Sequence, residues 1–544
     1  MHTDSQYFSR HARPASWLVL LLTFLLAACG GGDGGGGTDN NAFVIDPTPL
    51  PTPPGGGTET PPPDAGAAVW LPDAHAHSHV ATFGSFPSGL DLFDNTLFVT
   101  DADQIESAGV RIVPLEISAG APLPSTRYTT TQIVAGQLLD FAGMAADLSN
   151  PIGFGFFTNE IRVMTPTLGF VLVNAAGSDS VPSLSNLVVF NPTTGTVRQV
   201  VNLSNTYDPG MPIADSTGAP VPGSAFIQSG AEALAVVPVS ATSARVYVAM
   251  SNLVFGAPSN GSTKYPGTIQ VYDVNPDAAI PVTPTSDPTF ATRTIRTIRY
   301  NPVALTVIQT TAGTLRSRLV VTVAGTTGFD MNFDLVPLTP ASIEIYDAAS
   351  GAFEGSFDLG LTGLAGVRPA LGRDAAGHQV GFFPSSVTGE VYLLHLDGLY
   401  DPVIDATRLA VLRGPGNGIP ITAASSGGPG GNLTGVGLSP DGKTLVVSGF
   451  GDLFAFPTPI PGQLFLLTLP DDVVSGAGFG ASFTPGSTLF GSTPGRTLSE
   501  FVLVPRAGGG PDVYVNMGGS LDGTTFVGTG PASVGTLETG GLIR

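Results

Sequence analysis

Short segments in which apolar and polar residues alternate recur through most of this chain, and they limit its fold more than any other feature. Such segments lie at residues 96–101, 170–174, 245–249, 319–323 and 391–394, and Gly, Asn, Asp and Pro residues separate them. A two-residue period is typical of β-strands, whereas the 3.6-residue period of helices is essentially absent. The chain is therefore expected to be all-β.

The strand segments form similar units that repeat roughly every 50 to 70 residues between about residue 87 and residue 516. A unit has two apolar strands joined by a turn, then a variable loop and a further strand that often ends at an Asp-containing turn. A small antiparallel sheet repeated in this way is typical of the blades of a β-propeller. We expect a single β-propeller, with seven blades favoured and six or eight as the alternatives.

Parts of the chain resemble the YVTN family of propellers. Residues 438–447 (Leu-Ser-Pro-Asp-Gly-Lys-Thr-Leu-Val-Val) are similar to that family's hairpin between inner strands, and residues 343–351 (Ile-Glu-Ile-Tyr-Asp-Ala-Ala-Ser-Gly) to its third strand and turn. Residues 80–90 resemble its passage from an outermost strand into the next innermost one. The resemblance implies a fold and leaves function open. It also implies that an N-terminal strand before Phe83 completes the last blade beside residues 535–543 and closes the ring.

The single cysteine, Cys29, follows Leu26-Ala27-Ala28 at the end of an apolar run and precedes a glycine tract. This arrangement resembles a bacterial lipoprotein signal, and the run is shorter than the roughly 20 residues that span a bilayer. We expect residues 1–28 to be removed and Cys29 to carry a lipid anchor in the bacterial cell envelope. Because Gly30 follows the cysteine, the pattern resembles that of outer-membrane lipoproteins, on the periplasmic or surface face, if the cell is Gram-negative.

Residues 30–66 differ in composition from the rest of the chain. Their first half is rich in Gly and their second half in Pro, and Phe43-Val44-Ile45 is their one apolar triplet. Such segments behave as flexible or extended spacers because they have little apolar surface to bury. We therefore expect residues 29–66 to be a disordered tether and residues 67–544 to form the propeller.

The charge of the chain excludes one class of partner. It has 42 acidic and 21 basic residues, for a net charge of −21 at pH 7, and loss of Asp4, Arg10 and Arg13 with the signal changes this to −22. An acidic chain without a basic stripe repels phosphate backbones, so nucleic acid is not an expected partner. Anionic membrane surfaces do not attract such a chain electrostatically, so we expect the lipid anchor to provide its contact with the membrane.

Three histidines, His75, His77 and His79, alternate within the expected N-terminal closing strand. Residues at i, i+2 and i+4 of a strand share one face, and imidazole is a ligand for Zn²⁺ and Cu²⁺. However, side chains on that face are about 6.5 to 7 Å apart, and no cysteine lies nearby. A metal site, adventitious metal binding, and a polar edge that discourages sheet addition all stay open.

Two glutamates, Glu232 and Glu500, fall at the beginning of expected innermost strands, from which their side chains could approach a central channel. Gluconolactonase-like propellers hold a divalent ion such as Ca²⁺ with acids in similar places, and the alternative is that these acids solvate the channel mouth. Residues 330–334 (Asp-Met-Asn-Phe-Asp) resemble half a calcium loop. Leu335 and Ala341 stand where its Gly and bidentate Glu would be, so we expect a solvated loop.

Motifs of several enzyme classes are absent from the sequence, including a phosphate-binding P-loop, a Gly-x-Ser-x-Gly nucleophile elbow and a Cys-x-x-Cys-His haem site. We therefore expect a lipid-anchored binding or scaffold module for a protein or an extracellular polymer, and an enzyme less so. The alternative is a divalent-metal-dependent envelope hydrolase of the lactonase-like propeller type. A surface protein without a discrete ligand is the third interpretation.

Overall fold

The computed structural model describes a β-rich molecule. Apart from positions 95, 222, 224, 241 and 326, the described residues are 43–45, 86–103, 109–116, 156–175, 184–252, 265–287, 293–310, 317–329, 335–421, 433–449, 462–475, 487–493, 498–504, 512–517 and 533–538. These residues confirm the all-β prediction, because almost every regular element among them is a strand.

Seven sheets of three to five strands follow one another along the described part of the chain, and we number them in chain order. Sheet 1 contains β2 (Phe86–Phe93), β3 (Thr96–Asp103) and β4 (Gly109–Glu116). Sheet 2 contains β5 (Phe156–Thr165), β6 (Leu168–Ala175), β7 (Leu184–Phe190) and β8 (Val197–Asn202). Sheet 3 contains β13 (Ala231–Ser240), β14 (Ser243–Met250) and β15 (Thr268–Val274), with β16 (Val282–Pro284) and β17 (Thr294–Arg296) both paired to β15.

The second half of the chain continues this pattern. Sheet 4 contains β18 (Pro302–Gln309), β19 (Ser317–Val323), β22 (Ala341–Asp347) and β23 (Phe353–Gly360). Sheet 5 contains β24 (Ala370–Arg373), β25 (Gln379–Pro384), β26 (Glu390–His395), β27 (Ala410–Arg413) and β28 (Ile419–Pro420). Sheet 6 contains β29 (Leu433–Leu438), β30 (Thr444–Gly449), β31 (Gly462–Thr468) and β32 (Ser487–Thr493). Sheet 7 contains β33 (Leu498–Val504), β34 (Asp512–Met517) and β35 (Ser533–Glu538).

The remaining described elements are short. Three strand pairs lie outside the main sheets: β9 (Thr206–Tyr207) with β12 (Phe226–Ile227), β10 (Ile213–Ala214) with β11 (Pro220–Val221), and β20 (Thr327–Phe329) with β21 (Leu335–Pro337). Single 3₁₀ turns form η2 (Asp397–Leu399) and η3 (Ala406–Arg408). Among the described residues, no helix has the length and apolar character needed to cross a membrane.

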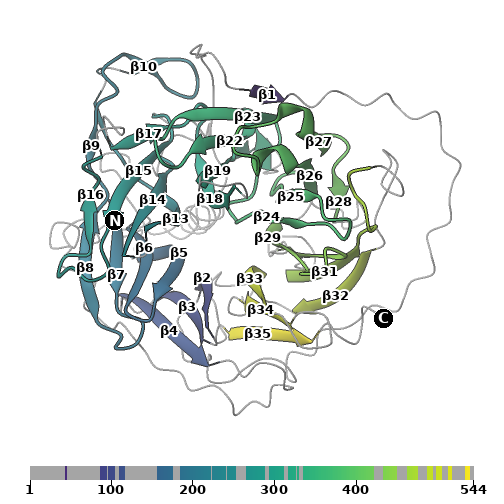
Figure 1. The fold of residues 1–544 in the computed structure, drawn as a ribbon, viewed down its shortest axis with the longest axis horizontal. Coiled ribbons are helices and arrows are strands. Elements are labelled where there is room, and N and C mark those ends of the chain that lie inside the picture. Colours follow the sequence, from purple (N-terminus) through teal and green to yellow (C-terminus); the bar gives the residue numbers. More distant parts are fainter. Residues whose placement is uncertain are drawn as a thin grey trace, which may run out of the picture.

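The seven sheets are arranged as a ring around a common centre (Figure 1). The first strand of each sheet lies nearest the centre and the later strands lie further out, which is the arrangement of a β-propeller. Sheets 1 and 7 are neighbours in this ring, and β2 contacts both β33 and β34. The centre of the molecule is therefore bounded by strands that lie far apart in the sequence.

Apolar clusters lie between neighbouring sheets. Because side chains alternate between the two faces of a strand, one strand contributes to a cluster on each side of its sheet. In β22, Ile343 and Ile345 belong to the cluster between sheets 4 and 5, whereas Tyr346 belongs to the cluster between sheets 3 and 4. All seven residues of this strand are buried. Similar clusters join sheets 1 and 2, sheets 2 and 3, and sheets 5 and 6. Each such strand is therefore stabilised on both faces.

The turns that resemble the YVTN pattern have clear physical causes. The Asp347 carboxylate accepts hydrogen bonds from the backbone N–H groups of Ala349 and Ser350, which ends β22. Between β29 and β30, the Ser439 hydroxyl accepts from the N–H of Thr444 and donates to Asp441. Gly442 has a φ of +72°, and a Cβ there would lie 2.5 Å from the carbonyl oxygen of Arg373. The turn thus requires glycine for its backbone shape and for close contact with sheet 5.

Parts of the N-terminal prediction lie outside the described residues. This holds for residues 67–85 and for residues 539–543 of the expected partner segment, whereas residues 535–538 of that segment belong to β35. The blade count of the whole chain and its closure by an N-terminal strand therefore stay predictions. Within the expected tether, Phe43–Ile45 form β1, which pairs in parallel with β23 at the outer edge of sheet 4.

Candidate functional site

Acidic residues near the start of three innermost strands lie at irregularities in the strand pairing. The register shifts between Thr158 and Ile161 in β5, between Ala231 and Ala233 in β13, and between Leu498 and Phe501 in β33. These intervals contain Glu160, Glu232 and Glu500, respectively. A bulge turns a side chain out of the regular alternation of a strand, so these acids need not follow the apolar alternation of their neighbours.

Carboxylates at the centre bind the backbone of the next sheet in the ring. Glu500 Oε2 accepts a hydrogen bond from the N–H of Leu90 in β2 at 3.1 Å. Asp91 Oδ2 accepts from the N–H of Val163 in β5 at 2.7 Å. Glu160 accepts from the N–H of Leu234 in β13. Together these contacts join sheet 7 to sheet 1, sheet 1 to sheet 2, and sheet 2 to sheet 3.

Arg368 connects this chain of carboxylates from the other side of the ring. It lies just before β24 of sheet 5, and its guanidinium donates to Glu500 Oε1 at 2.9 and 3.2 Å and to the carbonyl oxygen of Leu90 at 2.9 Å. Its Nε also lies 3.3 Å from Glu160 Oε1. One guanidinium therefore contacts residues of sheets 7, 1 and 2.

Arg162 completes the group, which we call the central charge cluster: Asp91, Glu160, Arg162, Arg368 and Glu500. It pairs with Glu160 and lies 4.0 Å from Asp91 Oδ1. Burial raises the pKa of Asp91, and the nearby Arg162 and Arg368 oppose this shift. Burial and the positive charge of Arg368 lower the pKa of Arg162 to about 9. Arg162 therefore stays protonated at neutral pH, and three carboxylates face two guanidinium groups.

A cavity of about 430 Å³ adjoins the central charge cluster. Its walls combine charged and apolar side chains from the innermost strands of sheets 1, 4, 5, 6 and 7 and from the segment that leads into β24. The lining residues are Asp91, Leu92, Thr306, Val367, Arg368, Pro369, Leu371, Gly435, Val436, Gly437, Glu500, Phe501, Val502 and Leu503. The Phe501 ring lies against bare backbone of β29, because a Cβ on Gly435 or Gly437 would come within 2.9 Å of it. The two glycines therefore place the aromatic ring in the cavity wall.

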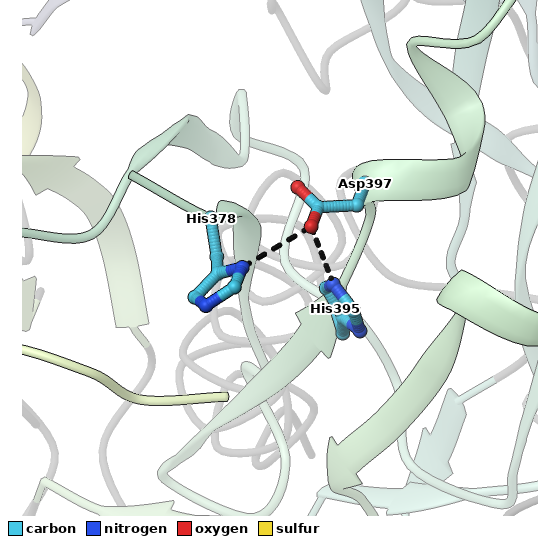
Figure 2. Close-up of side chains that lie close together, drawn as sticks. All are labelled: His378, His395 and Asp397. Atoms are coloured by element: carbon cyan, nitrogen blue, oxygen red, sulfur yellow. Dashed lines mark hydrogen bonds and ion pairs between the residues drawn. The ribbon is translucent and has the colours of Figure 1, made fainter. Parts of the chain in front are cut away.

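The two glutamates expected at the channel have different surroundings. Glu500 lines the cavity, but Glu232 is not among the lining residues. The Ser251 hydroxyl donates to Glu232 at 3.2 Å, and burial of the carboxyl raises its pKa to about 8 despite this hydrogen bond. Among the residues described, the group with metal-ligating geometry is His378, His395 and Asp397, and it includes neither glutamate (Figure 2).

The remaining expected sites are outside the described residues. This applies to Cys29, to His75, His77 and His79, and to residues 330–334. Sequence reasoning missed Glu160, although it occupies the same place on its strand as Glu500. Arg368 lies in an irregular segment, and no local pattern indicates its contacts.

Comparisons with known proteins identify no family for this chain. No family model matches it, and no curated protein matches its sequence. Solved structures with similarity include hydrazine synthase of Kuenenia stuttgartiensis, with a TM-score of 0.39, 11% identity, and coverage of 80% of this chain and 94% of that one. Another is the α-L-arabinofuranosidase Arb93A of Fusarium graminearum, with a TM-score of 0.36, 10% identity, and coverage of 94% and 100%.

A prolyl endopeptidase has a TM-score of 0.37 and 12% identity, and the match covers 85% of this chain and 48% of that one. Similarity at these levels transfers no activity. The propeller architecture of this chain rests on its own strand pairing, and the resemblance to the YVTN family stays a prediction.

We expect a double-mutant cycle of Arg368→Gln and Glu500→Gln to show a coupling free energy of about 1–2 kcal/mol, because the pair is partly desolvated and shares Leu90 as a backbone partner. Urea unfolding of the four proteins measures it. The exposed pair Lys443 and Asp471 is the matched control, and it should show little or no coupling. Equal coupling for both pairs would contradict a central role for Arg368.

Glu232→Gln should make stability less dependent on pH. The folded-state pKa of Glu232 is about 8 and the ordinary value is 4.5, so the folded protein keeps a proton that the unfolded chain releases between these values. The resulting stabilisation is complete below about pH 4.5 and is lost as the pH rises to about 8. Gln resembles the protonated acid and does not ionise.

We therefore expect Glu232→Gln to exceed the wild type in unfolding free energy at pH 8.5 by on the order of 2–4 kcal/mol, with little difference at pH 4.5. Urea titrations at both pH values test this. Asp277→Asn removes a negative charge from an exposed turn and is the control. If the variant and the wild type differ in unfolding free energy by the same amount at both pH values, the folded protein does not keep a proton on Glu232.

Proposed function

We propose that this chain is a lipid-anchored β-propeller of the bacterial envelope that binds a ligand in the cavity beside the central charge cluster. The observation that carries this proposal is the composition of the cavity wall. Asp91, Arg368 and Glu500 provide charged groups, whereas Phe501 and Val436 provide apolar surface. Cavities that combine a few oriented polar groups with apolar walls are typical of ligand sites.

The dimensions and charge of the cavity limit what it accepts. Its volume of about 430 Å³ lies within the range of about 300–1,000 Å³ for small-molecule sites. This space suits a small molecule or one projecting unit of a protein or an extracellular polymer. The carboxylates are hydrogen-bond acceptors and Arg368 is a donor. A bound group with hydroxyl or amino donors and an apolar face would match both parts of the wall.

The interactions of the acids favour binding over a metal-dependent hydrolase. A divalent ion at Glu500 would compete with Arg368, which donates twice to one oxygen, and with Leu90, which donates to the other. Asp91 is likewise engaged by the backbone of Val163. Both oxygens of Glu500 are therefore engaged by partly buried donors of the same protein, which disfavours coordination of an ion there.

The cellular location in this proposal rests on the sequence. Cys29 would be acylated after removal of residues 1–28, and residues 29–66 would hold the propeller away from the membrane. The acidic charge of the chain is consistent with a partner other than nucleic acid. The bound protein or polymer would then be a component of the envelope.

Val367→Trp should fill the cavity and abolish ligand binding. Val367 lies in the irregular segment that leads into β24, so the larger side chain disturbs no strand pairing. Wild-type and variant proteins are compared by interferometry against fractionated envelope polysaccharide and envelope protein, with at least a tenfold loss of affinity expected. Val239→Trp, at a position that is 59% exposed, is the control and should bind normally. Unchanged binding by Val367→Trp would place the ligand elsewhere.

Cys29→Ser should leave the precursor unprocessed and without a lipid, because the thiol is the acceptor of the acyl chain. Mass spectrometry of the membrane and soluble fractions measures this, with the acylated, shortened chain expected only in the wild type. Ser5→Ala, within the same signal but away from the cysteine, should be processed normally. An unmodified Cys29 in the mature membrane-bound protein would refute the anchor.

A further inference from the structure

Two histidines and an aspartate meet at the end of sheet 5 where β25 begins and β26 ends. His378 directly precedes β25, His395 is the last residue of β26, and Asp397 begins η2. Antiparallel pairing of β25 with β26 places Val380 opposite His395, which brings the turn before β25 next to the end of β26. The contacts from both imidazoles converge on one carboxylate oxygen (Figure 2).

The distances within this group fit the coordination sphere of a small metal ion. His378 Nδ1 lies 3.2 Å and His395 Nε2 lies 3.1 Å from Asp397 Oδ2. The three ligand atoms all lie within 4.8 Å of one another. In a tetrahedral zinc site with bonds of about 2.0–2.1 Å, two ligand atoms are separated by about 3.3 Å. Little movement is therefore needed to place all three atoms around one ion.

One buried ring nitrogen in the group has a carboxylate oxygen beside it but forms no hydrogen bond with it. His395 Nε2 is buried and makes no hydrogen bond, even though Asp397 Oδ2 is 3.1 Å away. The oxygen thus lies near the ring nitrogen without the alignment that a hydrogen bond requires. A buried polar atom without a hydrogen bond is costly to the fold. A metal ion would provide this nitrogen with a partner, because the nitrogen would donate its lone pair to the metal.

Groups outside the three ligand candidates lie beside two of these side chains. The second carboxylate oxygen of Asp397, Oδ1, accepts a hydrogen bond from the N–H of Gln379 at 2.7 Å. The other ring nitrogen of His378, Nε2, faces Asp472 Oδ1 at 3.8 Å. Carboxylates beyond a ligating histidine are a common feature of metal sites, because they fix the ring and its tautomer. The Gln379 N–H therefore orients Asp397 with Oδ2 toward the shared position.

We propose that His378, His395 and Asp397 bind a divalent transition-metal ion, with Zn²⁺ as the best match. Two imidazoles and one carboxylate are a typical donor set for zinc, and a fourth position is left for water or another group. The site is separate from the cavity of the proposed function, since none of its residues lines that cavity. Metal binding at this site would not depend on whether the central cavity binds a ligand.

The surroundings indicate a structural role at the junction of sheets 5 and 6. The turn that carries His378 already contacts the segment after β31: the N–H of Ala376 donates to the carbonyl oxygen of Asp471, and the N–H of Val473 donates to Asp374. Asp472, the outer carboxylate of His378, belongs to that segment. An ion at this place would link the start of β25, the end of β26 and η2 within sheet 5, and it would so stabilise the turn that contacts the segment after β31.

One neighbouring cation opposes metal binding. Arg408 Nη2 lies 3.4 Å from Asp397 Oδ2, and its other nitrogen pairs with Asp401 at 2.8 Å. The Arg408 side chain is 47% exposed and can leave the site. Its positive charge should nevertheless weaken the binding of a second cation. Removal of this charge therefore provides a test in which affinity is expected to rise.

The test is calorimetric titration of ZnCl₂ into the full-length protein, purified in detergent and stripped of metal with EDTA. His378→Ala should lose one equivalent of bound Zn²⁺ or bind it at least about 100-fold more weakly, a larger effect than the roughly 10- to 100-fold cost of removing an outer partner. His395→Ala should behave in the same way. Arg408→Gln should bind Zn²⁺ more tightly than the wild type.

The matched control is the triple variant His75→Ala, His77→Ala and His79→Ala, which removes the other histidine group of the mature chain. It should keep the bound equivalent, and zinc should raise its melting temperature as in the wild type. Circular dichroism establishes that each variant is folded. The proposal is overturned if folded His378→Ala and His395→Ala bind Zn²⁺ like the wild type, or if the triple variant loses all binding.

Discussion

Strands in this protein are apolar on both faces, and no sheet can bury both of its faces alone. Alternate residues of β22 belong to different clusters, one shared with sheet 3 and one with sheet 5. A linear stack of such sheets would leave an apolar face at each end. A ring brings the two end sheets next to each other, which is how the described sheets are arranged in Figure 1. The convergence of innermost strands at the centre is a consequence of the same requirement.

At the centre of the ring, the innermost strands carry charged side chains in addition to apolar ones. Inner strands converge there, and bulges turn Glu160 and Glu500 out of the regular alternation. Their carboxylates then accept hydrogen bonds from backbone N–H groups of neighbouring sheets. Arg162 and Arg368 offset their charge. The polar groups that form the candidate site are thus the same groups that finish the inner edge of the fold.

The strands and several turns could be predicted from the sequence, because each depends on residues that are close together in the chain. The Asp347 turn needs only a carboxylate and the next few N–H groups, and the position of Glu500 at the start of an innermost strand followed from the strand pattern. The partners of Glu500 could not be predicted. Arg368 is 132 residues away in the chain and belongs to no regular element. Likewise, His378 and His395 meet only because β25 pairs with β26, and their separation in sequence resembles no metal motif.

The contacts of Arg368 have a consequence for how the chain acquires its structure. The guanidinium belongs to the segment before sheet 5, yet it holds Glu500 of the last described sheet and the carbonyl of Leu90 in the first. The two ends of the propeller are therefore joined through a residue from the middle of the chain. This join cannot be complete until all three regions have folded, so the last step of folding should engage them together. Because these contacts link regions that are far apart in the sequence, we expect the ring to unfold cooperatively and not sheet by sheet.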